Sequence, residues 1–87
     1  MPVYLIVIIP RAEKQLEAVA EPFRRRIRNA IVALADNPRP HGVAKIAGSV
    51  NEYRIRVGDF RVIYLIEDRV VTVTVTRIAP RDDVYRR

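Results

Sequence analysis

The 87-residue sequence contains no cysteine and only one histidine, His41. Without cysteine the chain has no disulfide framework, no thiolate zinc ligand and no thiol nucleophile. A single histidine excludes a histidine pair for metal binding or for acid–base catalysis. These absences argue against a metalloenzyme or a redox protein, and we expect no metal and no other cofactor.

Long hydrophobic runs are also missing. The apolar run at residues 3–9 is far shorter than the roughly 20 residues that span a bilayer. It also lacks the cationic region and the cleavage site of a signal peptide. Its β-branched residues and the closing Pro10 predict a strand buried on both faces. We therefore expect a cytoplasmic protein without a membrane partner.

Lysine is scarce, although the chain is basic. Sixteen Lys and Arg residues against ten Asp and Glu residues give a net charge of +6, and only Lys14 and Lys45 are lysines. Arginine grips phosphate through a planar fork, whereas lysine acts as a point charge. This composition favours nucleic acid as the partner. A charge that serves solubility, or an acidic protein partner, remains an alternative.

The pattern of apolar residues predicts one α+β domain over residues 1–87. It predicts a helix at residues 11–20 and a second helix after Pro22, whose apolar stripe consists of Phe23, Ile27, Ala30, Ile31 and Leu34. Three strand-like stretches separated by tight turns follow, at residues 50–57, 60–67 and 70–78. The expected order is β-α-α-β-β-β, an antiparallel sheet with a helical hairpin packed on one face.

The first predicted hairpin gathers positive charge on one face of the sheet. With Gly58 and Asp59 as its two-residue turn, Arg56 lies opposite Arg61, and Arg54 shares their face. Like charges directly opposed in a ladder are unfavourable, so this cluster favours a bound anion such as phosphate. Extension into solvent or pairing with carboxylates elsewhere is the alternative. The other face carries the residues expected to pack on the helices: Tyr53, Ile55, Val57, Phe60, Val62 and Tyr64.

The C-terminal segment offers two further candidates for a site. Arg81 follows the last strand and could join the arginine cluster, and Tyr85 offers a ring for base stacking. Packing of Tyr85 over the sheet edge is equally consistent with the sequence. Other cations could add attraction to RNA or to a ribosome: Lys45, Arg39, Arg77, Arg24, Arg25 and Arg28.

Several segments resemble the RelE family of the RelE/ParE toxin superfamily. They are residues 37–40, residues 45–48, the stretch YRIRVGDFRVIY at 53–64 and the closing stretch at 78–85 with its R-x-x-x-Y spacing. The likeness covers essentially the whole chain, including the order of elements, and it implies the RelE-like fold.

The resemblance implies a toxin of a type II toxin–antitoxin pair that cuts mRNA in the ribosomal A site. In that family the ribose 2′-hydroxyl attacks the adjacent phosphate without a metal. The implied partners are a cognate antitoxin, the ribosome and mRNA, with operator DNA bound only through the antitoxin complex. The implied catalytic residues are Arg54, Arg56, Arg61, Arg81 and Tyr85.

The chain departs from the family pattern where proton transfer would be expected. Arg54 and Arg56 stand where well-studied relatives have lysine, and arginine effectively cannot lose its proton. Proton transfer is thereby left to Tyr85, Glu52 or His41. A mechanism based on electrostatic stabilisation and orientation by arginines would need no strong base. Two other functions stay open: a ParE-like inhibitor of DNA gyrase, and a catalytically weak RelE-fold protein that only binds RNA or antitoxin.

Overall fold

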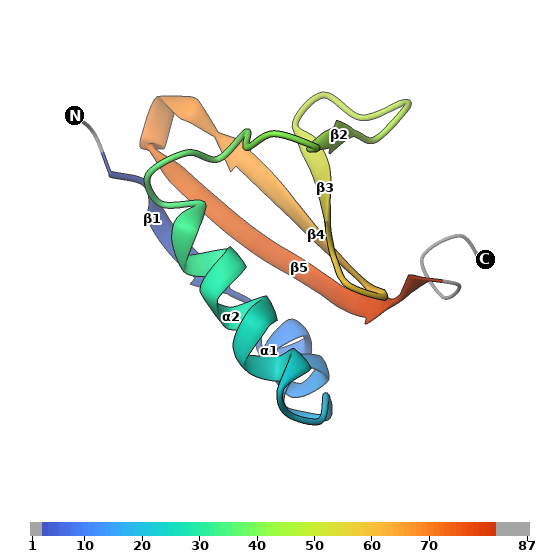
Figure 1. Cartoon of the computed structure of the whole chain (residues 1–87). Helices are drawn as coiled ribbons and strands as arrows, with labels where there is room; N and C mark the ends of the chain where they lie inside the picture. Colours follow the sequence, from blue (N-terminus) through green and yellow to red (C-terminus); the bar gives the residue numbers. More distant parts are fainter. Residues whose placement is uncertain (1–2, 82–87) are drawn as a thin grey trace.

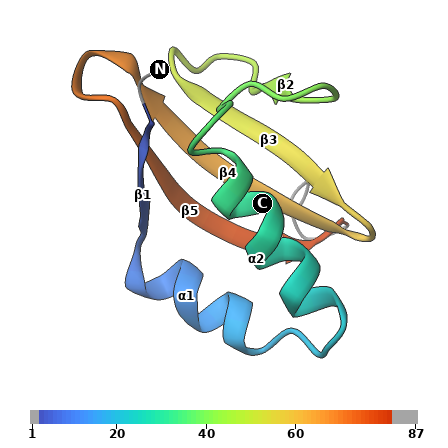
Figure 2. The same cartoon turned by 60° about the vertical axis from the view of Figure 1, so that its left-hand side comes forward.

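The computed structural model describes residues 3–81 and shows two helices on one face of a five-stranded sheet (Figure 1). The strands lie in the order β1-β5-β4-β3-β2. The elements follow one another as β1 (Leu5–Ile8), α1 (Pro10–Glu17), α2 (Phe23–Ala33), β2 (Ala44–Lys45), β3 (Glu52–Val57), β4 (Phe60–Glu67), the 3-10 turn η1 (Asp68–Val70) and β5 (Thr72–Pro80). Both views place α1 and α2 on the same side of the sheet (Figure 2). The predicted α+β class and the helical hairpin on one face are confirmed.

The sheet is mixed rather than wholly antiparallel. β3, β4 and β5 pair antiparallel, as the sequence predicted for the two hairpins. The two-residue strand β2, which the sequence did not predict, pairs antiparallel with β3. β1 runs parallel to β5, with Leu5 opposite Thr72 and Ile8 opposite Val75. Tight turns fix only the strands that they join. Because β1 connects to the rest through two helices, its direction was not set by any turn in the sequence.

The burial of β1 differs from the expectation that both of its faces are covered. It is an edge strand, and Leu5 and Val7 remain 63% and 38% exposed. Ile6 and Ile8 pack against the core. The reason is that the helices cover only one face of the sheet, so alternate side chains of β1 face outward.

The core lies between the helices and the predicted inner face of the hairpin. Leu16, Ile27, Ile31 and Leu34 are almost completely buried against the sheet, whose inner residues include Ile55, Val62, Tyr64, Val73 and Val75. Fully burying one such aliphatic side chain stabilises a fold by about 1.5–3 kcal/mol. The stripe predicted for the second helix is confirmed at its buried positions, whereas Phe23 at the start of α2 is 40% exposed. No helix within residues 3–81 is long and apolar enough to cross a membrane.

Candidate functional site

A groove of about 620 Å³ lies on the side of the sheet away from the core. Its floor is one cross-strand row in which Arg54 on β3, Ile63 on β4 and Arg77 on β5 are in register. Arg11 and the loop at residues 46–49 complete the lining. The groove therefore combines a central apolar side chain with guanidinium groups from three elements.

A β-bulge places Arg77 in this row. Ile63 pairs with Arg77 but Tyr64 pairs with Val75, so Thr76 is an extra residue in β5. Strand side chains alternate between faces, and without the extra residue Arg77 would point towards the core. The Thr76 hydroxyl donates to the Ile63 carbonyl at 3.3 Å, which ties the bulge to β4.

The helical layer also holds the bulge. The backbone N–H of Ile78, the residue after Arg77, donates to Oε1 of Gln15 on α1 at 2.8 Å. A bulge disrupts the ladder locally, and a side-chain acceptor can satisfy an N–H that the ladder leaves over. The sequence predicts Arg77 only as a further cation, because no local pattern indicates its central position in the groove. That position depends on the bulge.

Arg11 is a groove residue that the sequence analysis missed. The N–H of Ile9 donates to the Val75 carbonyl at 3.1 Å, which keeps the chain beside β5 at the end of β1. Arg11, the second residue of α1, then follows next to the bulge and lines the groove. No local pattern in the sequence indicates that β1 pairs with β5. The place of Arg11 in the groove could therefore not be predicted.

Glu52 is the single acidic residue in the groove lining among residues 3–81. The loop before β3 fixes its backbone: its N–H donates to the Ser49 hydroxyl at 3.0 Å, and its carbonyl accepts from the Ile46 N–H at 2.9 Å. Glu52 and Arg54 are two residues apart on β3, so their side chains share the groove face. The site thus places one carboxylate beside its arginines.

The predicted opposition of Arg56 and Arg61 is confirmed by the register of β3 and β4. The two side chains differ in exposure, since Arg56 is exposed whereas Arg61 is only 7% exposed. The Arg56 guanidinium folds back, and its Nε donates to the Gly58 carbonyl at 3.1 Å. This second row therefore lies next to the groove floor but outside the groove lining.

Arg81 lies at the same end of the sheet as the second row. Its N–H donates to the Asp59 carbonyl in the β3–β4 turn at 2.8 Å, and its side chain is exposed. The prediction that Arg81 adjoins the cluster thus agrees with its backbone position. Tyr85, the remaining predicted catalytic residue, lies outside the described residues.

Most of the other predicted RNA-binding cations lie away from the groove. Lys45 is in register with Tyr53, so it belongs to the helical side of the sheet. On α2, Arg24 forms an ion pair with Glu21 at 3.0 Å, and the exposed Arg25 lies on the same helix. Arg28 joins α2 to α1 through Glu13 at 3.3 Å. We therefore do not include these four residues in the site.

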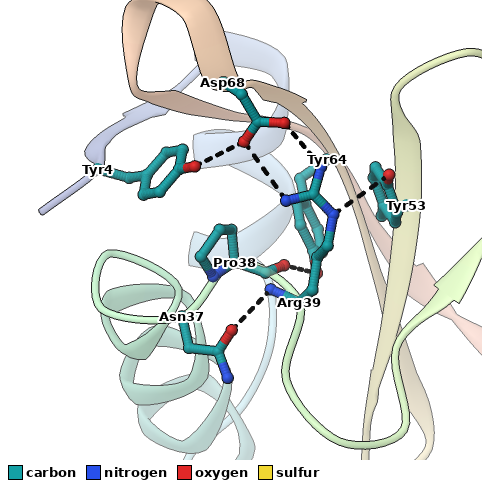
Figure 3. Close-up of polar contacts among 7 residues, drawn as sticks. All are labelled: Tyr4, Asn37, Pro38, Arg39, Tyr53, Tyr64 and Asp68. Atoms are coloured by element: carbon teal, nitrogen blue, oxygen red, sulfur yellow. Dashed lines mark hydrogen bonds and ion pairs between the residues drawn. The ribbon is translucent and has the colours of Figure 1, made fainter. Parts of the chain in front are cut away.

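Arg39 belongs to a separate network at one end of the sheet (Figure 3). Its Nη2 lies 2.9 Å from Oδ2 of Asp68, its Nε donates to the Tyr53 hydroxyl at 3.4 Å, and its guanidinium stacks 5.1 Å from the Tyr53 ring centroid. The Tyr4 hydroxyl donates to the same carboxylate at 2.6 Å. The network joins the residue before β1, β3, η1 and the loop after α2, so Arg39 has a structural role here rather than a place in the groove.

The electrostatics of this network follow from its hydrogen bonds. Hydrogen bonds from Arg39 and then from Tyr4 lower the pKa of Asp68 below its ordinary value. The bond to the Asp68 carboxylate raises the pKa of Tyr4. Beside them, burial raises the pKa of Tyr64 to about 12, and the Tyr64 hydroxyl donates to the Pro38 carbonyl at 2.8 Å. Each shift stabilises the protonation state that the network uses at neutral pH.

The three residues considered for proton transfer occupy different places. Glu52 lines the groove, and Tyr85 lies outside the described residues. His41 lines a different, mostly apolar cavity of about 510 Å³ between α2 and β3. Among residues 3–81, no group of three or more His, Asp or Glu side chains gathers as a metal site would.

Comparison with solved structures identifies the class of fold. The chain is similar to archaeal RelE in its complex with RelB from Pyrococcus horikoshii, with a TM-score of 0.81, 27% identity, and coverage of 91% of this chain and 96% of the other. It also resembles E. coli RelE in the intact RelBE complex, with a TM-score of 0.78, 23% identity, and coverage of 88% and 95%. The fold is therefore that of the RelE toxins.

Sequence comparison gives the family. Residues 6–85 match the model of the ParE toxin of type II toxin–antitoxin systems. A relative from Methanocaldococcus jannaschii that is named as toxin RelE1 is 28% identical over 86 residues, which is 93% of each chain. The chain therefore belongs to the ParE toxin family. The predicted resemblance to the RelE/ParE toxins is confirmed at that wider level.

Proposed function

We propose that this chain is a ribosome-dependent endoribonuclease that cuts mRNA in the A site. The observation that carries the proposal is the row of Arg54, Ile63 and Arg77 on the groove floor. Each guanidinium group can donate two parallel hydrogen bonds to the oxygens of one phosphate. The apolar side chain between the two arginines suits contact with a ribose or a base. The groove is open, so a single RNA strand can lie across it.

The proposed reaction is attack of a ribose 2′-hydroxyl on the adjacent phosphorus, without a metal. Arg54 and Arg77 bind the phosphate and stabilise the charge that develops on its oxygens in the transition state. Arg56 and Arg81 are exposed at the hairpin end and bind the flanking backbone, while Arg61 adds to the positive field of this face. Tyr85 is proposed to stack on a base. Ribosomal RNA helps to orient the substrate, so naked RNA is a poor one.

The proposed partners are a cognate antitoxin, the ribosome and mRNA. The P. horikoshii RelE and the E. coli RelE were each solved with RelB antitoxin, and we extend that pairing to this chain. Contact with operator DNA is proposed only through the antitoxin complex. We propose a cytoplasmic location because translating ribosomes are the site of action.

A second candidate function is inhibition of DNA gyrase, and the match to the parDE family model favours it. The two functions differ in what the groove arginines do. A cleavage reaction needs them at the scissile phosphate, whereas a gyrase inhibitor could lose them without losing its target. A protein that only binds RNA or antitoxin is the third candidate.

Inducible expression with mapping of mRNA 5′ ends tests the proposal. We expect new ends within translated codons, with a 5′-hydroxyl on the downstream fragment, and their loss in Arg54→Ala. Intact mRNA together with inhibited gyrase supercoiling in vitro would instead establish the second function. Intact mRNA with active gyrase would leave only binding to RNA or antitoxin.

A further inference from the structure

We infer that Glu52 is the proton acceptor for the attacking 2′-hydroxyl, an inference that rests on the proposed function. The chemistry of the groove lining leads to it. The ionisable residues in that lining are Arg11, Arg54, Arg77 and Glu52, and the remaining polar side chains are hydroxyls. Arginine effectively cannot accept a proton at neutral pH, so within the described lining only the Glu52 carboxylate can.

The surroundings of Glu52 suit this role. Its backbone is held at both ends by the loop at residues 46–49, through Ser49 and Ile46, which limits its movement relative to the groove. Within residues 3–81 its carboxylate accepts no hydrogen bond and forms no ion pair, in contrast to Glu13, Glu21 and Asp68. The carboxylate is therefore available to a ligand in the groove.

Its position relative to the phosphate-binding arginine is also suitable. Glu52 and Arg54 project from the same face of β3, two residues apart, which is about 7 Å along a strand. A 2′-hydroxyl and its adjacent phosphate are neighbours on one nucleotide. A phosphate on Arg54 thus brings the hydroxyl towards Glu52.

The proposed step conserves bonds and protons. The Glu52 carboxylate takes the proton of the 2′-hydroxyl, and the 2′ oxygen forms a bond to the phosphorus. The bond from phosphorus to the 5′ oxygen breaks, and this oxygen takes a proton from water. Glu52 then returns its proton to solvent, leaving a 2′,3′-cyclic phosphate, a 5′-hydroxyl and no net change in protons.

The test is single-turnover cleavage of mRNA on purified programmed ribosomes, measured across pH. We expect Glu52→Gln to lose about 100-fold or more in the cleavage rate, since general-base catalysis contributes 10²–10⁴-fold. The fall in rate of the wild-type protein towards acid pH should disappear in Glu52→Gln. Glu52→Asp keeps a carboxylate, and it should retain part of the rate together with the acid-side fall.

Two measurements separate proton transfer from a structural role. Thermal unfolding and the concentration for half-maximal ribosome binding should be unchanged in Glu52→Gln. Glu67→Gln is the matched control, because Glu67 on β4 lies on the same outer face of the sheet as Glu52 but outside the groove lining. Cleavage by Glu67→Gln should equal wild type.

The outcomes distinguish this inference from the proposed function. Wild-type protein that makes no ribosome-dependent cut would overturn both. Wild-type protein that cuts, with Glu52→Gln equally fast and equally dependent on pH, would overturn only the role of Glu52.

Discussion

The two sides of the sheet use arginine in different ways. Arg24 and Arg28 lie on α2, on the helical side, and Arg39 lies at one end of the sheet. Each of the three forms an ion pair with a carboxylate at 2.9–3.3 Å. On the groove side, Arg11, Arg54 and Arg77 come from three elements and line one concavity, to which residues 3–81 contribute a single carboxylate, that of Glu52. Net charge does not distinguish these groups. Strand register and the bulge in β5 do, because they decide which guanidinium groups face a common space.

The largest expected effect separates the two groups directly. Arg54→Ala should lower the rate of ribosome-dependent cleavage by about 100- to 1000-fold, because it removes a donor to the transition-state phosphate. Arg28→Ala removes an arginine of the helical side, and the rate should stay close to wild type, since an exposed ion pair contributes little. Equal losses in both variants, measured in the same single-turnover assay, would remove the distinction between the two sides.

A second prediction concerns the bulge that positions Arg77. Gln15→Leu removes the acceptor for the Ile78 N–H, and we expect a roughly 10- to 100-fold slower cleavage because a displaced phosphate ligand is poorly oriented. The lost hydrogen bond should also cost about 1–2 kcal/mol of unfolding free energy. Gln15→Glu keeps an acceptor oxygen and should restore most of both. A rate unchanged in Gln15→Leu would show that Arg77 does not depend on this contact.

The end of the sheet that carries the Arg39–Asp68 network and Tyr64 should matter for stability rather than activity. Tyr64→Phe removes the buried hydroxyl that donates to the Pro38 carbonyl and should lower the unfolding free energy by about 1–2 kcal/mol in urea titrations. Cleavage per folded molecule should not change. A clear loss of activity without loss of stability would contradict the assignment of this end as structural.

The smallest expected effect is the pH dependence of the Arg39–Asp68 contact. The pKa of Asp68 is lower in the folded protein than its ordinary value of 3.8, so its stabilising contribution is complete above that value and is lost as the pH falls through the folded pKa. Asp68→Asn should therefore unfold at a lower urea concentration than wild type at neutral pH. The two midpoints should converge in acid, and a difference that persisted there would point to another cause.

The sequence predicted most of the fold because its turns and apolar spacing are local signals. The Gly58–Asp59 turn fixed the register that sets Arg56 opposite Arg61, and the inner face of that hairpin is buried as expected. The prediction that both faces of β1 are buried was wrong, because the position of β1 at the edge of the sheet depends on the whole strand order.

The site was only partly predictable for a related reason. Arg54 could be assigned to the outer face from alternation alone. Arg77 depended on a one-residue bulge, and Arg11 depended on the parallel partner of β1, neither of which leaves a local pattern. The burial of Arg61 likewise depends on packing that alternation cannot report.

The most direct test of the account uses the groove itself. Purified wild-type protein, Arg54→Ala and Arg28→Ala are each mixed with programmed ribosomes, and the mRNA ends are mapped. We expect cuts at the A-site codon with wild type and Arg28→Ala, and their near absence with Arg54→Ala. No cleavage by wild type, or full cleavage by Arg54→Ala, would contradict this expectation.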